Sequence, residues 1–359
     1  MIEIMEESMT ISVEKALSGK NYIFLDVRSE GEFAEDHLEG ALNFALFNDE
    51  ERSRIGTIYR EDRSEAKLEG IRVASKKLEL LYTQIQALSS KHDRVVVYCW
   101  RGGMRSRAVV AFFRSLGMGN VLQLEGGYKE YRRIVNAYLE KDVEKLTFVV
   151  LHGRTGVGKT EILKKLKKRG VHTVDLEAHA SNSGSVFGRI PFGGRGPTQK
   201  RFDTLLFENL KDWDDYFILE SESKRIGDLH LKENFFQAMK RGVHILVDTN
   251  IENRVKIIAD DYVSPETEKQ IIGAIEALRK RLGGDAADRL VGQVKNDEYH
   301  EVIRYLMESY YDGLYDYSIK NVLEYDLEIT YEDIDEAVDA IEAWLVDKVF
   351  FRKADVVEK

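Results

Sequence analysis

The chain has 359 residues, which at roughly 150 residues per domain indicates two domains. Its 43% hydrophobic and 32% charged residues provide enough apolar material for packed cores and exclude wholesale disorder. A net charge of −10 repels polyanions on average, and apolar runs such as Thr147 to Leu151 are too short to cross a bilayer. The first seven residues are acidic, whereas a signal peptide begins with basic residues. We therefore expect a cytoplasmic protein without membrane contact.

The first 140 residues alternate between strand-like and helix-like runs. Short β-branched or aromatic runs predict strands at 22–27, 94–98 and 121–124. Apolar residues at helical spacing predict helices at 66–88 and 105–116. A charged run without Gly or Pro predicts a connecting helix over 128–145. This alternation predicts a mostly parallel sheet with helices on both faces.

A second α/β unit is expected to begin with a strand over 146–151. Further strands are predicted at 171–175, 216–220 and 243–248. The segment 181–200 holds five of the 27 glycines and two of the three prolines, which predicts a long loop or lid. From Pro265 on, the sequence is largely helical and acidic in pattern, with an amphipathic helix over 331–349.

Positive charge is concentrated in one part of this acidic chain. Between His152 and Arg201, eleven Lys or Arg residues stand against three Asp or Glu. A basic segment in an acidic protein is where a phosphate-bearing partner is expected to bind. A solvated helix face is the alternative explanation.

One motif in that segment matches the phosphate-binding loop at all eight positions and lies between a predicted strand and a predicted helix. Its residues are Gly153, Arg154, Thr155, Gly156, Val157, Gly158, Lys159 and Thr160. The glycines allow backbone N–H groups to surround phosphate oxygens, and the following helix adds its positive N-terminus. Lys159 supplies a point charge to the terminal phosphates, and the Thr160 hydroxyl is suited to bind Mg²⁺. The motif recognises diphosphate geometry, of which ATP is only the most frequent source.

A nucleotide hydrolase also needs an acidic residue at the end of a neighbouring strand to hold its metal ion. The candidates by position are Asp175, Glu177, Glu220 and Asp248. None of them follows an unambiguous run of four apolar residues, so no metal ligand is assigned. We expect no tightly bound cofactor, and Mg²⁺ is a candidate ion.

The only cysteine, Cys99, ends a predicted strand, and the loop after it leads into a predicted helix. The residues that follow Cys99 are Trp100, Arg101, Gly102, Gly103, Met104, Arg105 and Ser106. Loop amides, the helix N-terminus and the charges of Arg101 and Arg105 would stabilise a thiolate, or a persulfide or perselenide formed on it. Cys99 is therefore the candidate nucleophile, and a small buried core residue is the alternative. A single cysteine also excludes an intrachain disulfide and a four-cysteine zinc site.

Several motifs in the N-terminal half resemble those of a rhodanese domain. They are Asp26–Ser29, Glu32-Phe33, His37–Asn43, the cysteine loop and Glu125–Tyr128. The cysteine loop joined to a C-terminal phosphate-binding-loop domain resembles the tRNA 2-selenouridine synthase family over nearly the whole chain. Further motifs similar to that family are Asp175–Glu177, Ser185–Arg189, Phe207–Asn209, Ile226-Gly227 and Tyr310–Asp312.

This resemblance implies two α/β domains with parallel sheets. The first is a rhodanese-like domain over 12–138, and the end of the connecting helix and a linker occupy 139–146. The second, over 147–359, is a P-loop NTPase-like domain that includes the lid at 181–200 and a helical C-terminal region.

The family resemblance also implies an enzyme that acts on the wobble 2-thiouridine in the anticodon loop of tRNA. Geranyl diphosphate is expected to alkylate the sulfur, and selenium from selenophosphate then replaces the geranylated sulfur. The order is chemically sensible, because the sulfur of a C=S group leaves poorly whereas an alkylated sulfur departs as a thiol. The family places selenium on the rhodanese cysteine as selanylcysteine, which corresponds to Cys99. An enzyme that supplies selenophosphate is an implied partner.

Two sets of basic residues are candidates for contact with the diphosphate or the tRNA backbone. On or beside the lid these are Arg189, Arg195, Lys200 and Arg201. On the helix after the phosphate loop they are Lys164, Lys165, Lys167, Lys168 and Arg169. Backbone contacts of this kind are salt-dependent and independent of base sequence. A plain surface role is the alternative for both sets, with Ile162, Leu163 and Leu166 of the helix turned inward.

Two other functions fit parts of the sequence. One is a general rhodanese sulfurtransferase whose second domain is a nucleotide-dependent regulator. The other is a small-molecule kinase whose first domain only binds a partner. The single cysteine and the arginines of its loop argue against the kinase, because a pure binding module does not need such a loop. The basic segment argues against the general sulfurtransferase.

Overall fold

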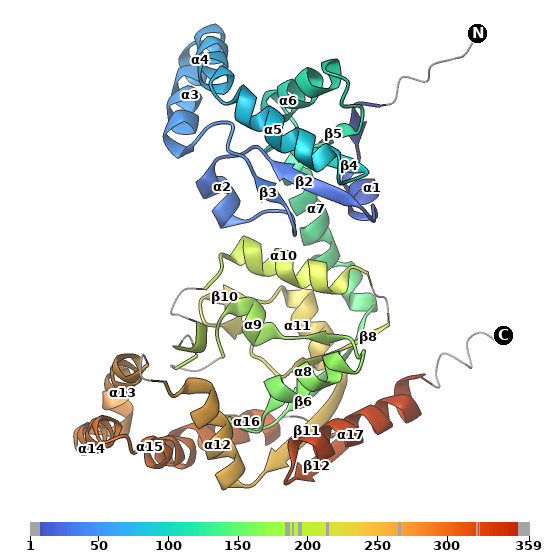
Figure 1. Cartoon of the computed structure of the whole chain (residues 1–359). Helices are drawn as coiled ribbons and strands as arrows, with labels where there is room; N and C mark the ends of the chain where they lie inside the picture. The colour runs from blue at the N-terminus through green and yellow to red at the C-terminus, as the bar shows by residue number, and fades with distance from the viewer. Residues whose placement is uncertain are drawn as a thin grey trace, which may run out of the picture. The chain divides into compact units, whose positions relative to one another are not determined.

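The computed structural model describes residues 8–350, apart from 184–186, 189, 193–195, 213–214, 265–266, 321 and 323. The chain forms two compact units (Figure 1). The first comprises Met1–Tyr138 and Thr198–Glu208, and the second comprises Leu139–Pro197 and Asn209–Lys359. Both are parallel α/β units, as the sequence predicts.

The first unit contains a five-stranded sheet in which every neighbouring pair is parallel. Its strands, in spatial order, are β1 (Thr10–Ile11), β5 (Val121–Leu124), β4 (Arg94–Tyr98), β2 (Tyr22–Asp26) and β3 (Leu42–Asn43). The central strand β4 reads Arg-Val-Val-Val-Tyr, and its last four residues are buried because helices cover both faces of the sheet. Cys99 follows β4 directly, so it lies at the carboxyl end of the central strand.

Seven helices of this unit follow in chain order. They are α1 (Val13–Leu17), α2 (Glu30–Glu35), α3 (Asp49–Glu61), α4 (Arg63–Ser75), α5 (Leu78–Ser89), α6 (Met104–Ser115) and α7 (Gly127–Glu140). The prediction of one helix over 66–88 is wrong, because α4 ends at Ser75 and α5 begins at Leu78. Lys77 stands at this break, and its ammonium group donates to Glu51 (2.9 Å) and to the carbonyl of Ala45 (3.2 Å). The predicted connecting helix corresponds to α7 and a 3₁₀ turn at Asp142–Lys145.

The second unit also contains a parallel five-stranded sheet. Its strands, in spatial order, are β12 (Leu327–Tyr331), β11 (Val243–Thr249), β6 (Thr147–His152), β8 (Tyr216–Glu220) and β7 (Thr173–Val174). A small antiparallel pair, β9 (Arg225–Ile226) and β10 (Leu229–His230), stands apart from this sheet. All four strands predicted for this half are present.

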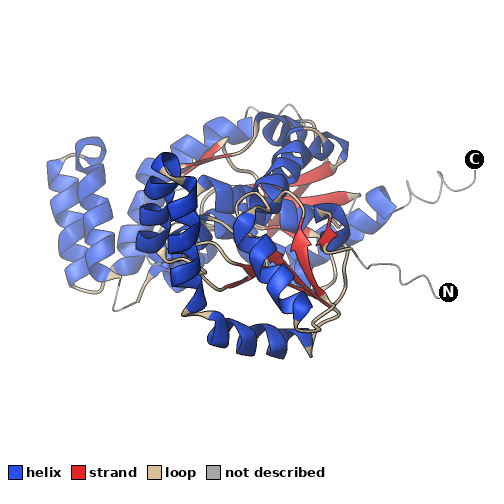
Figure 2. Ribbon diagram, turned by 90° about the horizontal axis from the view of Figure 1, so that it is seen from above, coloured by secondary structure: helices blue, strands red, loops and turns tan. Residues whose placement is uncertain are grey.

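Helices, drawn in blue in Figure 2, make up most of the ribbon around the strands, and those of the second unit follow in chain order. They are α8 (Lys159–Lys168), α9 (Leu176–Ala180), α11 (Glu233–Lys240), α12 (Ile251–Tyr262), α13 (Glu268–Leu282), α14 (Gly284–Lys295), α15 (Tyr299–Leu306), α16 (Asp312–Lys320) and α17 (Ile334–Leu345). A 3₁₀ turn lies at Ile190–Phe192, and π-helical turns lie at Met307–Tyr311 and Val346–Phe350. In the part of the chain that the structure describes, no helix has both the length and the apolar character of a membrane span.

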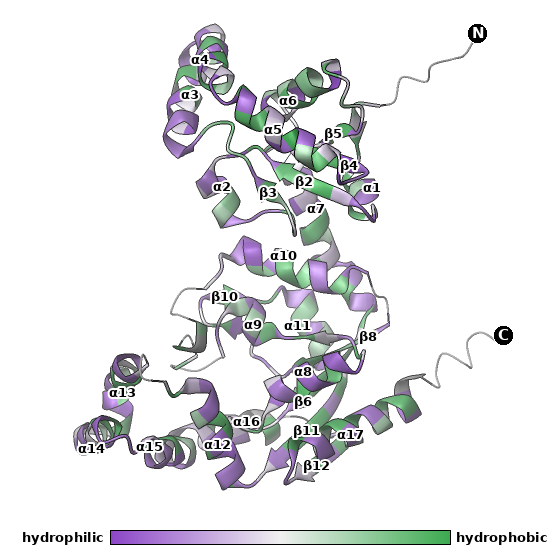
Figure 3. Ribbon diagram, viewed as in Figure 1, coloured by the Kyte–Doolittle hydropathy of each residue, from purple (hydrophilic) through white to green (hydrophobic). Residues whose placement is uncertain are grey.

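The C-terminal third differs from its prediction at one point, where β12 joins the sheet. Leu327 and Ile329 alternate with polar residues and pack against the core, which is the period of a strand. The helix predicted over 331–349 therefore begins later, at Ile334, after a capping box between Asp333 and Glu336. The buried residues of α17 are Ala337, Val338, Ile341 and Leu345, which recur at helical spacing as predicted for an amphipathic helix. Figure 3 shows both hydrophobic and hydrophilic residues along this helix.

Helix α10 (Gln199–Leu210) packs with the first unit, although the sequence places 147–359 in one domain. A buried carboxylate holds it there. The Oδ2 atom of Asp36 accepts hydrogen bonds from the hydroxyls of Thr204 (2.9 Å) and Tyr128 (2.8 Å). Arg132 pairs with Asp203 at 3.0 Å, and burial raises the pKa of Asp36. Such a long-range polar network has no signature in the local sequence pattern.

The ion pair between Asp26 and Arg28 is fully buried, with 2.7 Å between Asp26 Oδ2 and Arg28 Nη2. We predict that Asp26→Asn lowers the free energy of unfolding of the first unit by about 3–5 kcal/mol, because the guanidinium loses its buried counter-charge. Hydrogen–deuterium exchange at the amides of β2 and β4 measures this loss. Arg72→Ala breaks the exposed pair with Glu65 and is the control, with an expected cost below about 1 kcal/mol. Equal exchange rates in the two variants would contradict the prediction.

Candidate active sites

The sulfur of Cys99 lies among hydrogen-bond donors at the start of α6. Its side chain is only 3% exposed. The Sγ atom accepts from the backbone N–H of Gly103 at 3.3 Å and lies 3.2 Å from the hydroxyl oxygen of Ser106. Gly103 is the N-cap residue of α6 and Ser106 lies in its first turn, and the N-terminus of a helix carries partial positive charge. The structure therefore brings together the sulfur, the loop amide and the helix N-terminus that the sequence predicts.

Two glycines allow the cysteine loop to approach the turn before α7. Gly102 and Gly127 have φ values of +59° and +58°, in the left-handed region. A Cβ atom on Gly127 would stand 2.2 Å from the carbonyl oxygen of Cys99. Gln123 of β5 holds the cysteine loop in place through two hydrogen bonds. Its side-chain amide donates to the carbonyl of Gly102 (2.6 Å) and to Ser106 Oγ (3.1 Å). Gln123 was not predicted, because only the sheet register brings it to the loop.

The two loop arginines differ in their surroundings. Arg101 is exposed, whereas Arg105 donates to Glu32 at 3.0 Å. Burial would raise the pKa of Glu32, but the charge and hydrogen bond of Arg105 outweigh burial and lower the pKa. Glu32 is therefore ionised and balances the charge of Arg105. Beside the loop, the Trp100 ring lies 5.2 Å from that of Tyr128, and Met104 is exposed.

The phosphate loop connects β6 to α8, as predicted. Gly153, Gly156 and Gly158 all have positive φ values, which only glycine adopts without strain. The ammonium group of Lys159 donates to the carbonyl of Gly153 at 3.0 Å, so it folds back over the loop. This conformation places the lysine charge and the start of α8 at one side of the loop, where phosphate oxygens bind in this motif.

Side chains distant in sequence hold the loop carbonyls. Arg254 of α12 is buried, donates to the carbonyl of Thr155 at 2.9 Å and pairs with Asp312. The hydroxyl of Tyr331, at the end of β12, donates to the carbonyl of Val157 at 2.9 Å. Neither residue belongs to a local motif, so neither could be predicted as a site residue from the sequence. Tyr310–Asp312, which includes the partner of Arg254, was noted only by resemblance.

Three glutamates gather beside the phosphate loop. Glu177 accepts from the Thr160 hydroxyl at 3.2 Å, and its backbone N–H donates to Glu220 at 2.8 Å. Glu220 ends β8, next to β6, and has no solvent exposure. Asp175 instead caps α9 by accepting from the N–H of Ala178. Glu222 completes the cluster and was not singled out as a site residue from the sequence.

Burial raises the pKa values of all three glutamates. The pKa of Glu222 rises to about 8, with the charge of Glu177 adding to the effect of burial. The pKa of Glu220 lies well above its usual value, and that of Glu177 is raised although Lys159 opposes the change. Glu222 is therefore mostly protonated at neutral pH and adds little negative charge beside a bound phosphate. Among the described residues, no group of three or more His, Cys, Asp or Glu is arranged to hold a metal ion.

Of the four basic residues predicted on or beside the lid, the structure describes only two. Arg189 and Arg195 lie outside the described residues. Lys200 and Arg201 lie on α10 in the first unit, where they pair with Glu35 (2.7 Å) and Glu39 (2.5 Å). Their predicted position on a lid is therefore wrong, because the helix begins at Gln199 and these acidic residues engage their charges.

The basic helix after the phosphate loop is α8. Its Ile162, Leu163 and Leu166 are buried, as the surface-helix alternative requires. Three basic side chains in and after the loop form ion pairs: Arg154 with Asp316 (2.8 Å), Lys165 with Asp335 (2.8 Å) and Arg169 with Asp339 (2.6 Å). The exposed positive charge of this region is thus smaller than the sequence suggests. Lys164, Lys167 and Lys168 are exposed.

Comparison with known proteins assigns the two units. Residues 10–134 match the model of the rhodanese-like domain, and residues 146–347 match that of the tRNA 2-selenouridine synthase AAA domain. The chain belongs to the tRNA 2-selenouridine synthase family. A member from Sulfurovum sp. (strain NBC37-1) is 32% identical over 88% of this chain and 94% of its own length. Members from Hydrogenovibrio crunogenus and Alcanivorax borkumensis are 32% and 31% identical, over 84% and 82% of this chain and 90% and 89% of theirs.

Membership of this family covers both sites of the chain. The cysteine loop lies within the match to the rhodanese-like domain, and the phosphate loop lies within the match to the AAA domain. The similarity of the whole chain to family members therefore includes the combination of the two sites, which was the basis of the resemblance seen in the sequence.

The raised pKa of Glu222 has a measurable effect on stability. The folded state keeps this proton up to about pH 8, whereas an unfolded glutamate loses it near pH 4.3. The free energy of unfolding should therefore fall as pH rises through this window, and Glu222→Gln should remove up to about 1.4 kcal/mol per pH unit of the slope. Urea unfolding at pH 5, 6, 7 and 8 measures it. Glu233→Gln, at an exposed position of α11, is the control that keeps the wild-type slope. Equal slopes for Glu222→Gln and wild type would refute the assignment.

Proposed function

We propose that this protein converts 2-thiouridine at the wobble position of tRNA into 2-selenouridine through an S-geranylated intermediate. Geranyl diphosphate and selenophosphate are the donors. The observation that carries the proposal is the presence, in one chain of this family, of a complete phosphate loop and of a cysteine surrounded by hydrogen-bond donors. A transfer that releases diphosphate needs the first site, and a chalcogen transfer needs the second.

The phosphate loop is assigned to geranylation. The sulfur of 2-thiouridine attacks C1 of geranyl diphosphate, the C1–O bond breaks, and diphosphate departs with the bonding electron pair. Negative charge grows on the leaving oxygens during this step, and preorganised N–H groups and Lys159 stabilise it without reorganisation. The protonated state of Glu222 reduces repulsion of the same charge. If the diphosphate binds as its magnesium complex, the side-chain oxygens of Thr160 and Glu177 are the candidate ligands of the ion.

The cysteine loop is assigned to selenium. Once alkylated, the sulfur leaves C2 of the base as geranylthiol, and selenium that derives from selenophosphate takes its place. We assign Cys99 and its loop to this exchange. The selenium of selenophosphate attacks C2, the C2–S bond breaks with its electron pair on the departing geranylthiolate, and hydrolysis of the P–Se bond releases phosphate. The Gly103 amide and the start of α6 lie beside the Cys99 sulfur, where they would stabilise an anionic selenium donor. No oxidation state changes in this exchange, so a chain with a single cysteine needs no disulfide to complete it.

Two substitutions should separate the two steps. We predict that Lys159→Ala lowers the rate of geranylation at least 100-fold, because the variant lacks the positive charge that stabilises the departing diphosphate. Cys99→Ser should leave geranylation intact and block selenium insertion, so that the geranylated nucleoside accumulates. The measurement is mass analysis of nucleosides after incubation of 2-thiouridine-containing tRNA with both donors.

A matched control and two contrary outcomes define this test. Lys295→Ala removes an exposed lysine of α14, outside the loop and outside the basic residues considered for tRNA contact, and should leave both steps unchanged. Geranylation that survives Lys159→Ala would remove the phosphate loop from the proposal. Rapid turnover of thiosulfate and cyanide with tRNA left unmodified would point instead to a general sulfurtransferase.

A further inference from the structure

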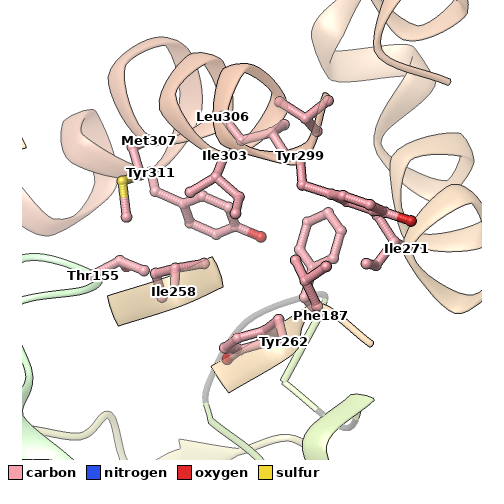
Figure 4. A pocket seen from close by; sticks show the side chains of 12 residues that line it. Thr155, Phe187, Ile258, Tyr262, Ile271, Tyr299, Ile303, Leu306, Met307 and Tyr311 are labelled. Atoms are coloured by element: carbon pink, nitrogen blue, oxygen red, sulfur yellow. The ribbon is translucent and has the colours of Figure 1, made fainter. Parts of the chain in front are cut away.

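A largely apolar pocket lies in the second unit, between α12 and the helices α13 and α15 (Figure 4). The side chains that form most of its wall are Phe187, Ile258, Ile271, Ile303, Leu306 and Met307. The pocket has a cavity volume of about 60 Å³, so it is narrow and suits a slender group better than a bulky one. Apart from Phe187, which belongs to the Ser185–Arg189 motif, nothing in the sequence pattern distinguishes these residues from ordinary core residues.

The pocket adjoins the phosphate loop directly. Thr155, Ile258 and Tyr262 line both this pocket and the cavity around Lys159 and Thr160, so the two spaces share a wall. A Cβ atom on Gly156 would stand 2.7 Å from the terminal methyl of Met307 and 3.1 Å from Ile258. The loop backbone thus lies against the wall of the pocket. A ligand with its diphosphate in the loop would have its organic substituent beside an apolar surface.

The lining selects among diphosphates. A nucleoside brings ribose hydroxyls and base edges that need hydrogen-bond partners, whereas most of the lining is aliphatic or aromatic carbon. The side-chain polar groups in the lining are the hydroxyls of Thr155, Tyr262, Tyr299 and Tyr311. A hydrocarbon chain has no such requirement, and each buried methylene strengthens binding about fourfold. Phe187 and Tyr299 add flat faces, which suit a chain containing double bonds.

We propose that this pocket binds the isoprenoid chain of a prenyl diphosphate whose head group occupies the phosphate loop. The identity of the head group rests on the proposed function, whereas the preference for an apolar tail rests on the pocket. The pocket then sets the choice of donor by chain length. It also gives the phosphate loop a role in binding a hydrocarbon donor in place of a nucleotide.

Binding without tRNA tests the pocket. Isothermal titration of the full chain compares inorganic pyrophosphate with dimethylallyl, geranyl and farnesyl diphosphates. We expect geranyl diphosphate to bind at least tenfold more tightly than dimethylallyl diphosphate and than pyrophosphate. Ile303→Trp, which fills the pocket, should lose at least tenfold in affinity for geranyl diphosphate and less than twofold for pyrophosphate. The matched control is Ile71→Trp, since Ile71 is 64% exposed on α4 of the first unit.

A second variant covers the case in which the added ring prevents folding. Ile303→Ala enlarges the pocket and should shift the preference towards farnesyl diphosphate. Affinity that does not depend on chain length, or ATP binding more tightly than geranyl diphosphate, would overturn the pocket proposal.

The two proposals fail in different ways. Unchanged kcat/KM for geranylation by Ile303→Trp would refute the pocket and leave the proposed function standing. Chain-length-dependent binding that Ile303→Trp abolishes, with tRNA that is never geranylated, would support the pocket and refute the proposed function.

Discussion

Both candidate sites depend on the same constraint, which is the way a parallel strand passes into a helix. The chain leaves β4 at Cys99 and β6 at Gly153, and in each case a glycine-containing loop leads to a helix N-terminus. Parallel sheets place such loops at the carboxyl edge, where backbone N–H groups face outward and attract negative charge. In the first unit the group at this position is a sulfur, and in the second it is the lysine of a phosphate loop.

The surroundings give the two loops different chemistry. The cysteine loop places its sulfur in a buried position beside an amide, with the charge of Arg105 balanced by Glu32. The phosphate loop combines Lys159 with glutamates whose pKa values are raised by burial, so that less negative charge opposes a diphosphate. An apolar pocket shares a wall with the phosphate loop, whereas a nucleotide would need polar partners there. This combination supports transfer from a hydrocarbon diphosphate.

The sequence pattern was sufficient to predict those parts of the sites that are formed by consecutive residues. The phosphate loop, the cysteine loop and the strands before them follow from spacing and glycine content, and the structure has them at those positions. Contacts between distant residues could not be predicted. Arg254 and Tyr331 support the phosphate loop from α12 and β12, and the buried Asp36 network fixes α10 on the first unit. The same network explains why Lys200 and Arg201, read as lid residues, instead lie on α10 among acidic partners.

Under the proposed function, alkylation at the phosphate loop must precede selenium insertion at the base. The most direct test omits one donor: 2-thiouridine-containing tRNA is incubated with the protein and selenophosphate, with and without geranyl diphosphate, and its nucleosides are analysed by mass. We expect 2-selenouridine only when geranyl diphosphate is present. Formation of 2-selenouridine at the same rate without geranyl diphosphate would refute this order of steps.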